Sequence, residues 1–109
     1  MPDDPAVRPG VESEVLAQSD DVRFTLYTLA PGGEIPWHFH SEVTDWFICR
    51  EGTVTVYSQA PDTSVTLSAG EMHEMPARRV HRVLNTGDGT CGFALVQVLG
   101  RYDFNPFDG

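Results

Sequence analysis

The sequence carries its clearest signal between residues 32 and 52, which read GGEIPWHFHSEVTDWFICREG. His38 and His40 are separated by one residue, and Asp45 follows five residues after His40. Side chains at positions i and i+2 leave the same face of an extended strand, whereas a helix points them apart. The spacing therefore predicts a β-strand through the two histidines, with both imidazoles on one side.

A second segment, residues 70–85, reads GEMHEMPARRVHRVLN and contributes a third histidine, His81. Together the two segments resemble the pair of motifs that characterise the cupin family. The resemblance covers residues 31–85, and each anchor position of both motifs is matched or conservatively replaced. It implies an all-β fold, a jelly-roll barrel of the double-stranded β-helix type.

Two positions depart from the family pattern. The acidic position of the first motif is usually Glu and is Asp45 in this chain, and a turn glycine of the second motif is replaced by Arg78. The first departure affects the fourth ligand of a metal site. The second leads us to expect a different turn before His81.

The resemblance implies a metal site in which His38, His40, His81 and Asp45 are the ligands. Imidazole and carboxylate groups suit Fe(II), Mn(II), Ni(II), Cu(II) or Zn(II), so we expect one divalent transition metal ion per chain. Asp is shorter than Glu by one methylene. Asp45 therefore either coordinates the metal after a small strand shift, or does not coordinate it and holds a ligand histidine or a bound water in place. Four ligands leave one or two positions open for water, O2 or a substrate.

Length and charge restrict the possible partners. The chain has 109 residues, enough for one domain with a single core. Acidic residues number 16 against 7 basic ones, all of them Arg, and the formal net charge is −9. Nucleic acids and anionic membranes both require clustered positive charge, so we expect neither as a partner. A small molecule is the expected ligand.

The cysteines and the N-terminal residues bear on the compartment. Cys49 and Cys91 lie in apolar runs and form no C-x-x-C pattern, so we expect two buried free thiols. The first residues, MPDDP, lack the positive charge and apolar core of a secretory signal, and no apolar run reaches membrane-spanning length. These features predict a cytoplasmic protein.

Short β-rich runs recur between Gly, Pro, Asp and Asn residues, and no helical periodicity is sustained. The predicted strands are Val22–Leu29, Ile35–His40, Asp45–Arg50, Thr53–Gln59, Ser64–Leu67, Glu71–Met75, Arg79–Asn85 and Cys91–Leu99. Residues 1–14, with three Pro and four acidic groups, are predicted to form a flexible arm. Residues 15–109 then form a single cupin barrel with a C-terminal aromatic tail.

Strand alternation predicts which side chains face the barrel lumen. The predicted inward sets are Phe47 and Cys49 beside Asp45, then Arg79, Val83 and Asn85 beside His81, and, in the last strand, Phe93, Leu95 and Gln97. The resulting pocket is largely apolar with one polar end. We expect Phe47, Val83, Leu95 and Gln97 to bind the substrate, with Gln97 either orienting it or serving as an ordinary strand residue.

The tail, residues 101–108, carries three aromatic side chains and is too apolar to remain wholly in water. It is expected to dock, either over the barrel mouth of its own subunit or across a dimer interface. Exposed strand edges and this tail together predict a homodimer.

Three classes of function fit these features, because a fold alone does not fix an activity. The first is a metal-dependent enzyme, for which the resemblance implies an oxygenase, isomerase or lyase acting on a small organic substrate. The second is a non-catalytic module that binds or senses a small ligand. The third is a metal-free cupin similar to sugar epimerases, with a histidine as base. Three converging imidazoles favour the first class over the third.

Overall fold

The computed structural model of the chain describes residues 9–107, which form ten β-strands and no helix. The strands are β1 (Val11–Gln18), β2 (Val22–Leu29), β3 (Glu34–Phe39), β4 (Thr44–Glu51), β5 (Thr53–Ser58), β6 (Thr63–Ser68), β7 (Met72–Met75), β8 (His81–Asn85), β9 (Cys91–Val98) and β10 (Asn105–Pro106). Across residues 9–107 no helix is long and apolar enough to cross a membrane.

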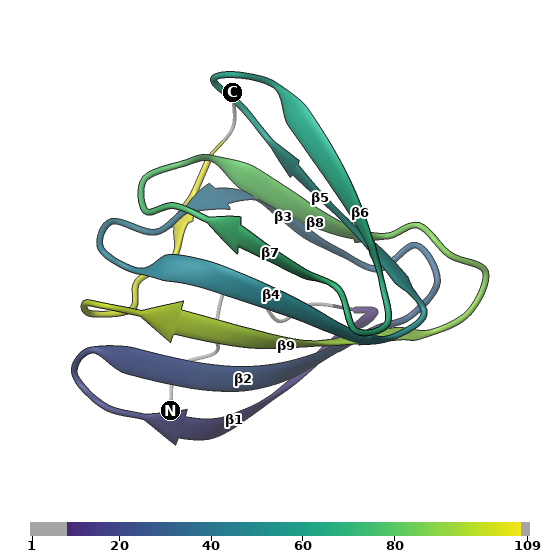
Figure 1. Cartoon of the computed structure of the whole chain (residues 1–109), viewed down its shortest axis with the longest axis horizontal. Helices are drawn as coiled ribbons and strands as arrows, with labels where there is room; N and C mark the ends of the chain where they lie inside the picture. The colour runs from purple at the N-terminus through teal and green to yellow at the C-terminus, as the bar shows by residue number, and fades with distance from the viewer. Residues whose placement is uncertain (1–8, 108–109) are drawn as a thin grey trace.

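The strands form two five-stranded antiparallel sheets that face each other (Figure 1). The first sheet has the order β1-β2-β9-β4-β7, and the second has the order β10-β3-β8-β5-β6. Chain neighbours such as β3 and β4 lie in different sheets, so the chain winds between the layers. This arrangement confirms the predicted jelly roll of the double-stranded β-helix type.

The two inner faces form one apolar core. Along β4 the side chains alternate between half-buried and buried, and Phe47 and Cys49 are buried beside Asp45 as predicted. In β9, Phe93, Leu95 and Gln97 share the inward face, also as predicted. Because a sheet facing another sheet buries every second residue, the alternation of the sequence is sufficient to assign these faces.

One predicted inward residue lies elsewhere. Val83 and Asn85 are buried with His81, but Arg79 precedes the first residue of β8 and is only half-buried. Its guanidinium donates hydrogen bonds to the backbone oxygens of Gln59 and Pro61. The prediction for Arg79 was wrong because the strand begins two residues later than expected.

Two strands were not predicted from the sequence. Val11–Gln18 forms β1 at the edge of the first sheet, so residues 11–14 belong to the barrel and not to the predicted arm; residues 1–8 lie outside the described part of the chain. β1 is mostly exposed and rich in polar side chains, so it lacks the alternation of a half-buried strand. β10 contains only two residues, one of them a proline.

The turn before His81 contains a residue in the left-handed region. Arg78 has a φ of 67°, in the left-handed region that glycine adopts most readily. Its backbone N–H donates to the carbonyl oxygen of His40 over 2.7 Å. Arg78 therefore adopts a backbone conformation that glycine adopts most readily.

Candidate metal centre

Three histidines and one aspartate meet between the two sheets. His38 and His40 come from β3 and the residue after it, His81 begins β8, and Asp45 reaches across from β4 in the first sheet. One potential ligand atom from each of the four residues lies within 4.8 Å of the others, and all four side chains are buried. The structure thus brings together the four residues that the sequence singled out, in a cluster able to hold a metal ion.

A β-bulge in β3 turns His38 into this cluster. Ile35 pairs with Val83 and His38 pairs with His81, so β3 uses three residues where β8 uses two. Both Ile35 and His38 are therefore buried, although simple alternation would place them on opposite faces. The extra residue falls at Pro36–Trp37, where a proline is tolerated because the ladder is already interrupted.

Each histidine is oriented through its Nδ1 atom by a backbone carbonyl. The Nδ1 atoms of His38, His40 and His81 lie 2.7, 2.6 and 2.8 Å from the carbonyl oxygens of Pro36, Asp103 and Arg79. A carbonyl oxygen only accepts hydrogen bonds, so each Nδ1 carries the proton. In a neutral imidazole, Nε2 is then left with a lone pair, the form that binds metals.

The remaining atoms of the cluster face one another without hydrogen bonds. Asp45 Oδ2 lies 3.1 Å from His40 Nε2 and 3.2 Å from His81 Nε2, yet these three buried atoms have no aligned hydrogen-bond partner in the described structure. Lone pairs that face each other in a buried site leave polar groups unsatisfied, which is costly. A cation between them would satisfy all three, so the residues fit a metal ion.

The surroundings of the cluster shift the pKa values of His38 and His40 in opposite directions. Burial, together with the neighbouring His81 and His40, lowers the pKa of His38 to about 3. Burial also acts to lower the pKa of His40, but the Asp45 carboxylate outweighs it and raises that pKa above its usual value. Burial opposes ionisation of Asp45, whereas His40 and His81 hold its pKa well below the usual range. His38 and Asp45 are thus in ligand form at neutral pH.

These shifts predict how metal affinity depends on pH. A proton on His40 competes with the metal. As the pH is lowered, metal affinity should therefore begin to fall while the pH is still above 6.5, and it should then drop at least about tenfold per pH unit. His38 should add no competition until the pH nears 3. Competition with a chelator between pH 8 and pH 5 measures this dependence. A metal affinity that does not change over that range would contradict the prediction.

Asp45 is held by a hydrogen-bond chain that leads to Arg23. Gln97 Nε2 donates to Asp45 Oδ1 over 3.0 Å, and the Arg23 guanidinium donates to Gln97 Oε1 over 3.4 Å. This arrangement reserves Oδ2 for the histidines. The sequence placed Gln97 on the correct face, but its neighbour in the structure is the carboxylate of Asp45.

A small cavity lies beside the cluster. The residues that line it include the predicted Phe47, Val83, Leu95 and Gln97. They also include four that the sequence reasoning did not assign to the site, Tyr27, Ile35, Tyr102 and Phe104. Tyr27 could have been found from strand alternation. Alternation from His38 would have placed Ile35 on the opposite face, and no local signal indicated where the tail residues lie.

The aromatic tail docks on its own subunit. β10 pairs with β3, and the Asp103 side chain accepts a hydrogen bond from the backbone N–H of Ser41 over 2.8 Å. Phe104 stacks on His38 with a centroid distance of 4.3 Å. Of the two arrangements that the sequence left open, the structure shows the tail over its own barrel mouth.

The chain belongs to the cupin family, because residues 25–97 match the sequence model of the Cupin domain. No curated protein sequence matches the chain. Its fold is similar to that of an uncharacterized conserved protein with a double-stranded β-helix domain from Klebsiella pneumoniae, with a TM-score of 0.80 and 22% identity over 95% of this chain and 92% of that one.

Two larger enzymes share the fold. An oxalate decarboxylase from Lactobacillus farciminis, solved with formate, gives a TM-score of 0.82 and 16% identity over 93% of this chain and 32% of that one. An oxalate oxidase gives a TM-score of 0.79 and 18% identity over 95% of this chain and 58% of that one. At these identities the likeness extends to the fold alone.

Proposed function

We propose that the chain binds one divalent transition metal ion through His38, His40, His81 and Asp45, and that it is a metal-dependent enzyme acting on a small organic substrate. The observation that carries the proposal is a buried cluster of three imidazoles and one carboxylate. Backbone carbonyls fix the Nδ1 atoms of all three imidazoles, and the Nε2 atoms of His40 and His81 face Asp45. When bound, Fe, Mn, Ni, Cu or Zn would supply Lewis-acid chemistry, and the redox-active metals would also supply oxygen chemistry. An oxygenase, isomerase or lyase is the corresponding class.

The other residues of the cavity have separate tasks in this proposal. Phe47, Val83 and Leu95 line the cavity with buried apolar surface, so they exclude water and shape the space for substrate. Gln97 orients Asp45 through its hydrogen bond, and its side chain also lines the cavity. We propose that these four residues contact the substrate.

Short carboxylic acids are the first substrates to test. Oxalate oxidase and oxalate decarboxylase are built on the same fold, and a carboxylate suits a metal with open positions. The likeness supports oxalate as a candidate and extends no further, because the chain covers only 58% and 32% of those two enzymes.

Two other functions make different predictions. A non-catalytic cupin that senses a small ligand would bind metal and ligand without turnover. A metal-free cupin of the sugar-epimerase type would need a histidine as base, but the lone-pair Nε2 atoms of His40 and His81 both face Asp45 in place of an open substrate site. This geometry favours a metal.

Elemental analysis of protein purified without a metal-binding tag tests the proposal. We expect about one divalent metal ion per chain, and the apo protein should remain folded because 109 residues bury a sufficient core. Metal added back at about 100 times its Kd should stabilise the fold by about 2.7 kcal/mol, measured as a raised Tm. Purified protein that contains no metal, and whose Tm is not raised by any added divalent metal, would contradict the proposal.

Turnover separates the enzyme from the sensor. The metal-loaded chain should consume O2 or release CO2 with oxalate or a related short acid, and the His38→Ala/His40→Ala variant should not. Redox-active Fe, Cu or Mn in the native protein would favour oxygen chemistry, whereas Zn or Ni would favour Lewis-acid chemistry. Ligand binding without any turnover would identify a sensor.

We also propose that the protein works in the cytoplasm. The cysteines Cys49 and Cys91 are buried and unpaired, as expected for a reducing compartment. Burial raises the pKa of the Cys91 thiol to about 11, so this thiol stays neutral and unreactive. Both serve as small apolar side chains in the core.

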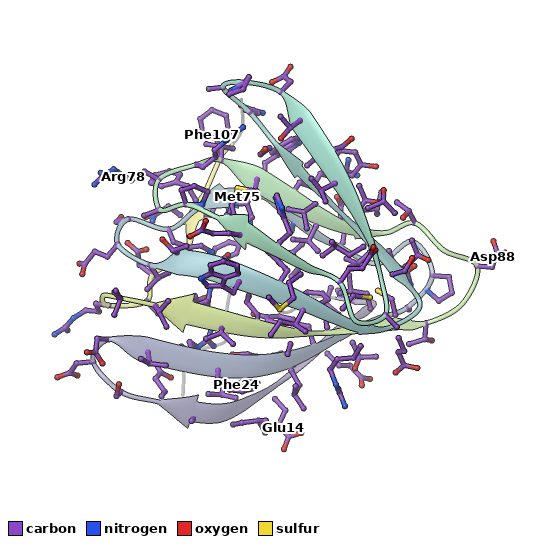
Figure 2. The ribbon with its side chains drawn as sticks, viewed as in Figure 1. Glu14, Phe24, Met75, Arg78, Asp88 and Phe107 are labelled. Atoms are coloured by element: carbon purple, nitrogen blue, oxygen red, sulfur yellow. The ribbon has the colours of Figure 1, made fainter. Side chains whose placement is uncertain are left out.

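A homodimer is the proposed assembly, and the outer face of the first sheet is its proposed interface. Neighbouring strands place partly exposed apolar side chains side by side on this face, namely Phe24, Leu26, Trp46, Ile48 and Val96. Figure 2 shows Phe24 on β2, beside the edge strand that carries Glu14. An apolar sheet face of this kind normally packs against a partner.

Sedimentation equilibrium tests the assembly. The full chain should be a dimer at micromolar concentration, and Trp46→Arg should shift it to monomer because a charge would be buried at the interface. The control, Thr66→Arg, adds the same charge on β6 of the second sheet and should leave the dimer intact. A monomeric full-length chain would contradict the proposal.

A further inference from the structure

The C-terminal strap, residues 101–106, lies across the barrel at the metal centre. It follows β9 and ends in β10, which pairs Asn105 with Phe39 and Pro106 with His38 (Figure 1). The Asn105 side chain donates to the Phe39 carbonyl over 3.2 Å. The strap is therefore hydrogen-bonded to β3, which carries His38 and is followed directly by His40.

Two aromatic side chains of the strap cover the cluster. The Phe104 ring stacks on His38 with a centroid distance of 4.3 Å and an interplanar angle of 16°. The centroid of the Tyr102 ring lies 5.5 Å from that of His40. The guanidinium carbon of Arg23 lies over the Tyr102 ring, 3.9 Å from its centroid. Both rings are half-buried and line the cavity.

The strap leaves little room. The space open to the centre of a water molecule in the cavity is about 10 Å³. One water molecule needs about that much, so the cavity accepts a donor group of very few atoms. The other residues that line the cavity lie in β-strands or, for His40, directly after one. Tyr102 and Phe104 belong to a segment paired through only two residues of β10.

We propose that Phe104, supported by Tyr102, is a specificity-determining residue that limits the metal centre to short carboxylates and excludes ligands with a ring beside the donor group. The inference rests on the proposed metal site and adds the substrate size. The Phe104 ring occupies the position over His38 that the ring of an aromatic acid would need, so an aromatic ligand must displace it. A short acid places its carboxylate without meeting the ring.

The test compares formate with benzoate, which present the same carboxylate with and without a phenyl ring. Both are titrated into the Co(II)-substituted full chain, and binding is read from the visible absorption of Co(II). In the wild type, formate should bind and benzoate should bind far more weakly. In Phe104→Ala the vacated space matches a phenyl ring, so benzoate affinity should rise about 10–100-fold while formate affinity stays the same.

Phe107→Ala is the matched control. Phe107 is an aromatic residue of the same tail, but it lines a separate groove with Arg78 and Arg79, and Figure 2 shows it near the end of the chain. This variant should bind both acids as the wild type does. Phe104→Leu retains an apolar side chain over His38 and should give an intermediate gain for benzoate, so the comparison remains possible if the alanine variant does not fold.

The outcomes distinguish this inference from the proposed function. Equal affinities for formate and benzoate in the wild type, or no gain for benzoate in either Phe104 variant, would overturn the inference while leaving the metal site in place. A wild-type chain that gives no Co(II) spectrum would overturn the proposed metal site, and this inference with it.

Discussion

The His38→Ala/His40→Ala variant is expected to lose high-affinity metal binding. Each substitution removes a buried imidazole whose Nδ1 is already fixed by a backbone carbonyl, so neither ligand can be replaced by a neighbouring side chain without a change of structure. Loss of a partner outside the ligand set typically costs about 10–100-fold in affinity, and the loss of two direct ligands should exceed that range. Chelator competition measures the effect.

His73→Ala is the control for this variant. His73 is the only other histidine of the chain and lies in β7, outside the cluster. Its removal should leave metal affinity unchanged. If the double variant binds metal as tightly as the wild type, the site has been assigned to the wrong residues.

The second large effect is expected at Asp45. Asp45→Ala removes the proposed ligand atom and a negative charge that lies within 3.2 Å of two imidazoles, so metal affinity should fall steeply. Asp45→Asn restores the shape without the charge and should recover little. In both variants the pKa of His40 should fall, because burial remains while the carboxylate that most raises this pKa is lost, and NMR titration can follow the change.

Gln97→Ala provides the comparison that separates two roles for Asp45. Gln97 donates a hydrogen bond to Asp45 Oδ1 and is not among the proposed ligands, so its loss should cost about 10–100-fold in affinity. If Asp45 is a direct ligand, Asp45→Ala should be clearly more severe than Gln97→Ala and should change the Co(II) spectrum. Equal costs and an unchanged spectrum would leave a site with three histidines alone.

The four residues of the cluster could be predicted from the sequence because they occupy the positions of two motifs that resemble those of cupins, and local rules predicted how their strands are oriented. The H-x-H spacing requires an extended strand, and strand alternation then places Phe47, Leu95 and Gln97 inside. Those assignments depend on neighbours along one strand, and the structure confirms the faces of all three. The recurring short β-rich runs indicated an all-β fold, and the resemblance of the two motifs to those of cupins predicted the jelly roll.

The features of the site that could not be predicted depend on contacts between segments far apart in the sequence. The bulge at Pro36–Trp37 that buries both Ile35 and His38 arises from pairing with β8, and strand periodicity gives no sign of it. The Asp103 carbonyl reaches His40 from 63 residues away, and Phe104 covers His38 only because the tail returns to β3. Arg78 adopts a backbone conformation that its residue type does not favour.

The most direct test of the account is a crystal structure of the metal-loaded protein with anomalous diffraction data collected at the absorption edge of the bound metal. We predict one strong peak per chain, bonded at about 2.0–2.2 Å to a nitrogen of His38, His40 and His81 and to an Asp45 oxygen. A peak at any other position, or none in crystals grown with excess metal, would contradict the assignment of this cluster as the metal centre.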